Sequence, residues 1–361
     1  MGITEISRKT MFFILVILAI FLTIILDLKI GIDALSILDY FYFVFLTVGV
    51  FYIFHPLYVN KRLTMYYWER TMRNRMAIFG LSFIVFLVII ATVGPFFTKD
   101  PNKVNFDEKN IPPLGFKMEQ SQYDIETGDF KTVVIKGSLK HPLGTDTAGR
   151  DILAMIVSGA MVSLQVGLIA TGIAISIGSV IGVVSAYFGG WVDNVLMRLT
   201  DIMMTFPFFL LLVLIVFIYG PSLVFIILVI GLTGWTGTAR LVRSEALSLR
   251  TREFILASKS VGASDSRIVF SHLIPNVISS IIVIATLMMP GVILSEAALS
   301  FIGLGDPNLA SWGRILKAGQ DTLATSWWIA VIPGIMLFLT VLAFNFFGDA
   351  LRDAFDPRSN I

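Results

Sequence analysis

The chain has 361 residues, of which 56% are hydrophobic and 14% are charged, and its formal net charge is +2. Ordinary soluble domains are less hydrophobic and carry more charge, so the composition indicates a membrane protein. The small net charge gives no reason to expect nucleic-acid binding. The chain has no cysteine, which excludes disulfides and thiolate metal sites.

Eight apolar runs are long enough to cross roughly 30 Å of hydrocarbon as helices. They lie near residues 11–27, 36–56, 76–97, 160–186, 198–219, 222–241, 278–303 and 327–348. The first run follows Arg8 and Lys9, as in a signal peptide, but no small-residue cleavage site follows Leu26, so we expect a retained helix. The sequence therefore predicts an all-α, multi-pass membrane protein.

Lysine and arginine set the expected orientation, because they concentrate in cytoplasmic loops. They crowd two connections, residues 61–75 and 240–267. Both connections are placed in the cytoplasm, and eight spans put both termini on that side. Residues 98–151 then form an external loop, in which KTVVIKG, from Lys131, has a strand-like pattern. A docking surface for an external protein and a simple spacer are both open interpretations of this loop.

Residues 60–75 interleave basic residues with Tyr66, Tyr67 and Trp68, as expected of a helix at the cytoplasmic membrane surface. This helix would separate two N-terminal spans, within residues 1–59, from the span at 76–97. A lipid-facing brace or partner site is one interpretation. An interfacial linker is the other, and the composition favours it.

A polar segment, residues 250–276, is wedged between long apolar runs and contains REFILASKSVGASDSRIVFSHLIPN. Its first half forms an amphipathic helix, with one face made of Phe254, Ile255, Ser258 and Val261. Gly262 can adopt the left-handed conformation that ends a helix, and Ser264 with Asp265 can cap a second one. Pro275 marks the turn into the next span. The pattern predicts a helix-turn-helix that a soluble partner grips.

This segment resembles the cytoplasmic loop of the permease subunits of binding-protein-dependent ABC importers. That loop reads Glu-Ala-Ala, three residues, Gly, nine residues, Ile, one residue, Leu-Pro. The matching positions are Ala257, Gly262 and Pro275. The departures are Leu256, Ser258, His272 and Ile274. Glu253, one turn earlier, is a candidate replacement for the missing acid.

Other segments resemble the oligopeptide and dipeptide branch of that family, and its C-type permease in particular. They are HPLGTDTAGRD from His141, YFGGWVDNVLMRLTD from Tyr187, GLTGWTGTARLVRSE from Gly231, SEAALSFIGLG from Ser295 and FNFFGDALRDAFDPR from Phe344. The resemblance runs from about Met72 to Arg358. It implies a type I ABC importer transmembrane fold, with six core spans, a core domain over residues 152–361 and two additional N-terminal spans.

The resemblance also implies that residues 250–276 are a coupling loop held by an ABC ATPase. The residues implied in this contact are Arg252, Glu253, Phe254, Ala257, Ser258, Gly262, Ala263, Asp265, His272 and Pro275. The chain has no GxxxxGK[ST] phosphate loop and no HExxH or GxSxG motif. We therefore expect a transport subunit that is no enzyme and holds no cofactor, with ATP and Mg²⁺ bound by partner ATPase subunits.

Several residues inside the apolar runs are candidates for the translocation path or its gate. Pro207 would kink its span where helices bend during gating. Glu296 either lines the outer part of the path or is satisfied by a neighbouring helix end or serine. Phe301 is a further candidate. Arg198 and Asp201, three apart on one helix, are expected to form a structural ion pair.

Small residues repeat along one helical face at Ser163, Gly167, Gly178, Gly182 and Ala186. Close helix packing explains them better than a pathway lining. Near the outer surface, an interfacial aromatic belt explains another set better than cargo contact, namely Phe301, Trp312, Trp327 and Trp328. At the membrane edge, capping or pairing is expected for Asp146, Arg150 and Asp151.

The expected function is that of a permease subunit forming half of a peptide path in an ATP-driven importer of a prokaryotic cytoplasmic membrane. The resemblance implies these partners: a homologous second permease, two ABC ATPase subunits, an external binding protein, peptide and the lipid bilayer. Nickel, haem and glutathione importers of the same branch stay open. An ion-driven secondary transporter is disfavoured, because Glu296 and Asp201 are too few and too scattered for an ion route.

Overall fold

The structure is a computed structural model that describes residues 61–123 and 130–355. In this described part, five helices are long and apolar enough to cross a membrane, and a bent pair adds a sixth crossing if its halves count as one. They are α4 (Arg75–Val93), α5 (Ile152–Phe188), α8 (Leu223–Arg250), α11 (Ile274–Phe301), α13 (Trp328–Phe355) and the pair α6 (Gly190–Thr205) with α7 (Phe208–Tyr219). The predicted multi-pass helical fold is confirmed, while the predicted spans at 11–27 and 36–56 lie outside the described residues.

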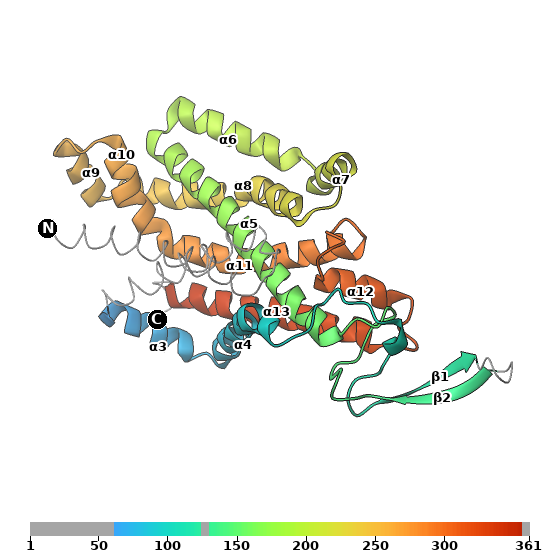
Figure 1. Cartoon of the computed structure of the whole chain (residues 1–361). Coiled ribbons are helices and arrows are strands. Elements are labelled where there is room, and N and C mark those ends of the chain that lie inside the picture. The colour runs from blue at the N-terminus through green and yellow to red at the C-terminus, as the bar shows by residue number, and fades with distance from the viewer. Residues whose placement is uncertain (1–60, 124–129, 356–361) are drawn as a thin grey trace.

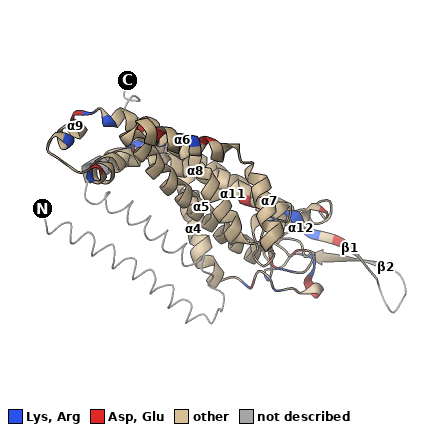
Figure 2. Ribbon diagram, turned by 90° about the horizontal axis from the view of Figure 1, so that it is seen from above, with Lys and Arg blue, Asp and Glu red and all other residues tan. Residues whose placement is uncertain are grey.

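The remaining elements are short and gather at the two ends of the bundle (Figure 1). They are α3 (Lys61–Met72), η1 (Gly94–Phe96), η2 (Phe106–Glu108), the antiparallel strands β1 (Lys117–Tyr123) and β2 (Phe130–Lys136), α9 (Glu253–Ser260), α10 (Asp265–Ile268), the π-helical turn η3 (Val269–Leu273) and α12 (Trp312–Gln320). The strand-like pattern is thus confirmed as β2. We call the end with α9 the loop end and the end with β1 the hairpin end. Figure 2 shows charged residues mainly toward these two ends.

The helix α5 runs through the middle of the bundle and packs closely against α8 (Figure 1). A Cβ on Gly178 would lie 2.6 Å from the carbonyl oxygen of Trp235, and one on Gly182 would lie 2.6 Å from that of Ala239. Real side chains do not approach a backbone so closely. The two helices therefore cross at this distance only because these positions are glycine, which confirms the packing role predicted for the small residues.

The span predicted at 198–219 is two helices, α6 and α7, whose axes differ by 71°. The bend predicted at Pro207 is therefore confirmed, but it divides the span into two helices instead of kinking a single one. Pro207 is the N-cap of α7, and its ring disfavours helical geometry in the residue before it. Phe206 accordingly has an extended conformation, with ψ = 121°. Because proline also lacks a backbone N–H, the helix ends at this point instead of bending.

Two tryptophans expected in an outer aromatic belt are buried instead. Trp312 is 0% exposed, and its indole N–H donates to the carbonyl oxygen of Ile156 at 3.0 Å. Trp328 is 2% exposed and donates in the same way to Thr145 at 3.0 Å. Indole rings gain most from burial when their N–H finds a partner. These two side chains therefore fasten α12 and α13 to α5 and the segment before it.

Candidate functional site

The 250–276 segment folds as the predicted helix-turn-helix. After α9 ends, Gly262 has a positive φ of +80°, and the next amide, of Ala263, donates to the carbonyl oxygen of Ser258 at 3.1 Å. Ser264 precedes α10 as predicted, although its side chain makes no capping bond. The helix α10 continues through η3 into α11 without a break, so Pro275 lies in the first turn of α11 and does not turn the chain.

Buried aliphatic side chains hold this segment to the loop end of the bundle. Ile255 of α9, Ile268 of α10 and Leu273 of η3 are at most 2% exposed and lie in one cluster with residues of α5 and α8. Beside them the hydroxyl of Tyr187 in α5 donates to Oδ1 of Asp265 at 2.5 Å. The turn is therefore fixed to α5, α8 and α11 and is not hinged from them.

The opposite side of the segment is exposed and largely apolar. Its large exposed side chains are Phe254 at 41%, Leu256 at 53%, Val261 at 86% and Phe270 at 60%. The predicted apolar face of the first helix is not continuous, because α9 ends before Val261 and only Ile255 of that face is buried. The result is a small apolar surface on a rigid support, which we call the turn surface.

The other residues predicted for coupling lie along the same segment, from Arg252 before α9 to Pro275 in α11. Exposed positions are Arg252, Glu253, Ala257, Asp265 and Pro275, and half-buried positions are Ser258, Ala263 and His272. Glu253 lies in the first turn of α9, where its negative charge interacts favourably with the positive end of the helix dipole. The structure therefore places the predicted set along the helix-turn-helix and the start of α11, while the role of this segment in coupling stays a prediction.

A charged cluster joins α6 to α8 beside the turn. Arg243 donates from Nε and Nη2 to the two carboxylate oxygens of Asp193, at 2.6 and 2.5 Å. The hydroxyl of Ser185 in α5 donates to the same carboxylate. Arg250, at the end of α8, donates to the carbonyl oxygen of Ala186 at 3.1 Å. Two parallel bonds between Arg243 and Asp193 fix the relative position of the two helices at the loop end.

The predicted ion pair between Arg198 and Asp201 does not form. Asp201 instead accepts a bond from Nη2 of Arg240 in α8, at 2.6 Å. Helical spacing places Arg198 near Asp201, but it does not reveal which helix packs alongside. Because α8 brings a guanidinium to the other side of this carboxylate, the pair forms between helices.

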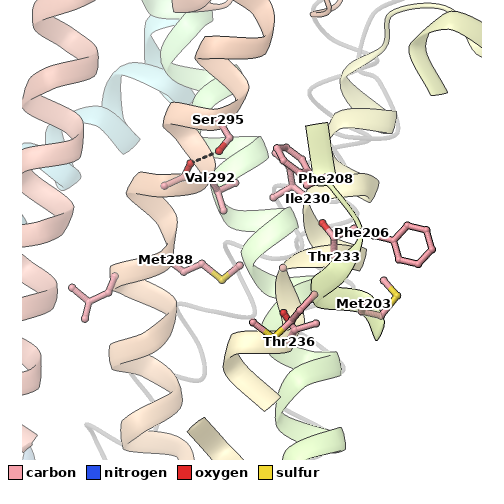
Figure 3. Close-up of a pocket in the computed structure, with 13 residues that line it drawn as sticks. Met203, Phe206, Phe208, Ile230, Thr233, Thr236, Met288, Val292 and Ser295 are labelled. Atoms are coloured by element: carbon pink, nitrogen blue, oxygen red, sulfur yellow. Dashed lines mark hydrogen bonds between the residues drawn. The ribbon is translucent and has the colours of Figure 1, made fainter. Parts of the chain in front are cut away.

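A cavity of about 570 Å³ opens between α6, α7, α8 and α11. Its apolar lining is Met203, Met204, Phe206, Phe208, Ile230, Leu287, Met288 and Val292. Its remaining lining is Thr233, Gly234, Thr236, Gly291 and Ser295. Figure 3 shows Met288 of α11 pointing toward α8, with Met203 and Phe206 of the α6–α7 break on the far side. None of these described lining residues is charged.

The polar groups of the cavity are hydroxyls and backbone. Of its three hydroxyl residues, Thr233 donates to the carbonyl oxygen of Val229 at 2.7 Å and Ser295 donates to that of Gly291 at 2.7 Å, so these two hydroxyl protons are held by their own helices. The first N–H groups of a helix have no partner within it, and no side chain caps those of α7. Backbone groups that are not bonded within a helix need protein or water as partners inside a membrane, and the break between Phe206 and Phe208 lies at the edge of this cavity.

Of the predicted path residues, only Pro207 adjoins this cavity, between the lining residues Phe206 and Phe208. Phe301 ends α11 beyond the cavity and is 37% exposed. Glu296 is 0% exposed, and its Oε1 accepts a bond from Ser300 at 2.6 Å. The prediction that Glu296 lines the path is therefore wrong for this structure, and the serine alternative is confirmed.

The helix α12 explains why Glu296 is covered. A Cβ on Gly313 of α12 would lie 2.0 Å from the carbonyl oxygen of Ala297, so a glycine lets α12 lie directly on this part of α11. The second carboxylate oxygen of Glu296 is buried without a partner among the described residues. The sequence could not show this contact, because α12 was not predicted as a packing element.

At the hairpin end, a histidine joins two carboxylates. The ring of His141 contacts Asp151 through Nδ1 at 2.8 Å and Glu108 through Nε2 at 3.1 Å. A bond from Lys140 lowers the pKa of Glu108 to about 2, against an opposing effect of burial and with a further contribution from His141. The predicted pairing and capping are confirmed for Asp146, Arg150 and Asp151. Among the described residues, no group of three or more His, Cys, Asp or Glu side chains could hold a metal ion.

Comparisons with known proteins agree with this arrangement. Residues 178–361 match the family model described as the binding-protein-dependent transport system inner membrane component. Residues 63–113 match the model described as the N-terminal TM domain of oligopeptide transport permease C. The chain belongs to this permease family. The resemblance predicted from the sequence is thereby confirmed, and the chain is a multi-pass membrane subunit.

Relatives cover most of this permease. It is 36% identical over 296 residues to the dipeptide transport system permease protein DppC of Bacillus subtilis (strain 168), over 81% of this chain and 84% of the relative. It is 36% identical to the oligopeptide transport system permease protein OppC of Haemophilus influenzae, over 80% of this chain and 87% of the relative. It is 37% identical to OppC of Escherichia coli (strain K12), over 80% of this chain and 89% of the relative. These relatives fall in the oligopeptide and dipeptide branch.

Proposed function

We propose that this permease forms half of a peptide path in an ATP-driven importer, with a homologous second permease forming the other half. The connection between the cavity and the turn surface carries this proposal. Both α8 and α11 contribute cavity residues, and both continue to the 250–276 segment. By helical rise, Thr236 at the cavity and Arg250 at the turn lie roughly 20 Å apart on one helix. Movement of the turn therefore reaches the cavity through continuous helices.

The motor in this proposal is a pair of ABC ATPase subunits, which bind ATP and Mg²⁺. The turn surface, with Phe254 and Val261 most prominent, is the part that one ATPase holds. When the nucleotide domains close and reopen, the fixed turn moves as a rigid body and tilts α8 and α11. This permease contributes no catalysis and no cofactor. Its part is to convert movement at the loop end into opening and closing of the cavity.

The proposed membrane is the cytoplasmic membrane of a prokaryote, with the loop end and both termini in the cytoplasm. The clustering of Lys and Arg at the loop end supports this orientation. The hairpin end then faces outward, and the β1–β2 hairpin is available to an external binding protein. Residues 1–59 are proposed as two additional spans. Residues 60–75 are proposed as an interfacial helix, whose Tyr67 contacts Phe355 of α13 with ring centroids 4.9 Å apart.

Peptide is the proposed cargo, because the relatives are named for dipeptide and oligopeptide transport. The test is ATP hydrolysis by the complete complex in lipid, with its binding protein loaded with peptide, nickel, haem or glutathione in turn. Stimulation by peptide alone is the expected result. Stimulation by one of the other loads would reassign the cargo. Absence of any ATPase from a complex that still transports along an ion gradient would overturn the proposal.

A further inference from the structure

The cavity has a lining that suits apolar side chains of varied shape. Three of its residues are methionines, Met203, Met204 and Met288, whose flexible thioether chains adapt to different surfaces. A charged side chain placed here would lose its hydration without gaining an opposite charge from any described lining residue. The cavity therefore favours apolar groups over charged ones, and its methionines can adapt to apolar groups of different shapes.

The break between α6 and α7 also adjoins this cavity, because Phe206 and Phe208 line it. The uncapped start of α7 at Phe208 offers N–H donors, and a lipid chain has no acceptor for them. A second transmembrane helix has few free acceptors, because its carbonyl oxygens are bonded internally. An extended peptide carries free carbonyl groups together with apolar side chains. Its chemistry therefore complements both parts of this cavity.

At Gly291 of α11 a side chain can be added to the cavity lining without displacing a neighbouring residue. A Cβ built on Gly291 meets nothing within 4 Å, so a side chain there enters open space. By contrast, a Cβ on Gly234 in α8 would lie 2.8 Å from the terminal methyl of Met288 and would displace it. Gly291 lies in the same turn of α11 as Met288 and Val292, two of the apolar lining residues.

We propose that this cavity holds apolar side chains of the peptide during transport, and that Gly291 sets which side chains it admits. The inference rests on the proposed peptide-import function and deepens it. The permease then has a selectivity of its own, in addition to that of the binding protein. Glycine at position 291 keeps the selection broad, because it leaves the space free and uncharged.

The test is peptide uptake by the complete transporter in proteoliposomes, with Gly291→Asp and Gly291→Lys compared with Gly291→Asn as an uncharged control of similar size. Tripeptides with a central Leu, Lys or Asp are the probes, and each uptake rate is divided by the wild-type rate for the same peptide. This division removes the preference of the binding protein. We expect Gly291→Asp to raise the Lys-to-Asp uptake ratio about tenfold and Gly291→Lys to lower it about as much, with Gly291→Asn near the wild-type ratio.

A matched control is Gly237→Asp on α8, where a Cβ also meets nothing within 4 Å but which does not line the cavity. It should leave the uptake ratio unchanged. An equal shift at Gly237 and Gly291, or equal slowing of all peptides at Gly291, would overturn the inference. Loss of the second permease from all three Gly291 variants would also overturn it, because a partner helix would then fill the cavity. A wild-type complex that imports no peptide would instead refute the proposed function.

Discussion

The α5–α8 pair and the α6–α7 arm are adjacent in this permease, yet they are built in opposite ways. Most residues of α5 are buried, and its glycines bring it onto α8. In α6 only Thr200 is buried, and in α7 only Leu212. A helix pair closed at glycine contacts cannot change its spacing, whereas an exposed arm can be covered by a partner or can move. The first region is a scaffold, and the second is the wall of a cavity.

The largest expected effect tests the scaffold. Gly178→Ala places a methyl group 2.6 Å from the carbonyl oxygen of Trp235, which is too close, so α5 and α8 must separate. We expect a loss of about 1–3 kcal/mol in the free energy of unfolding, typical of an overfilled interior. Thermal unfolding of the purified complex in detergent measures it.

The matched control for the scaffold is Gly237→Ala, where the added methyl meets nothing within 4 Å. It should not lower the unfolding temperature, and it should raise it slightly because alanine favours a helix more than glycine does. Equal unfolding temperatures for the two alanine variants would show that the α5–α8 contact is not as rigid as described.

A second prediction concerns how the scaffold receives movement. Gly262 has φ = +80° and open space around its Cβ, so Gly262→Val costs about 1–2 kcal/mol through backbone strain alone. We expect ATP hydrolysis to continue while peptide uptake per ATP falls severalfold, because the turn no longer holds its shape. Gly262→Asn, which tolerates this conformation, should keep the wild-type ratio. An unchanged ratio in Gly262→Val would remove the turn from the coupling route.

A third prediction compares the two ion pairs that join the arm to the scaffold. The side chains of Arg243 and Asp193 are 32% and 17% exposed, whereas those of Arg240 and Asp201 are 50% and 47% exposed. We expect Arg243→Gln to lower the free energy of unfolding by about 1–2 kcal/mol, because charged hydrogen bonds shielded from water stabilise a protein more than exposed ones do. Arg240→Gln should cost less than about 1 kcal/mol, as exposed pairs do. Unfolding temperatures of the two variants provide the comparison, and the reverse order would contradict it.

The smallest effect concerns acid at the hairpin end. The folded pKa of Glu108, about 2, lies below its ordinary value of 4.5, so this group adds stability above pH 4.5 and loses it as the pH falls from 4.5 toward 2. Lys140→Gln removes the largest cause of the lowered pKa. The variant should therefore show a smaller drop in unfolding temperature between pH 7 and pH 3 than the wild type. An equal drop would show that Lys140 does not hold this carboxylate.

Local sequence features predicted the scaffold better than the arm. Apolar runs located the spans, and the small residues of α5 identified its packing face, because length and spacing along one helix determine both. Gly262 was recognised because a left-handed turn has a specific chemical requirement. Each of these features depends on residues that are close in the sequence.

Contacts between distant segments were predicted poorly. Asp201 pairs with Arg240, and Glu296 is covered by α12, because the packing of a second helix decides both. The burial of Trp312 and Trp328 has the same origin. The cavity was missed because four helices contribute its lining, and only Pro207 signalled the break beside it. Its nearest sequence signal was a proline inside a predicted span.

The central claim is that ATP hydrolysis by partner subunits opens a peptide path lined by this permease. The most direct measurement is accumulation of a labelled peptide in proteoliposomes that contain the complete complex, with the binding protein and ATP supplied or withheld. The account predicts accumulation only when this chain, the binding protein and hydrolysable ATP are all present, with no dependence on an ion gradient. Accumulation driven by an ion gradient without ATP would contradict it.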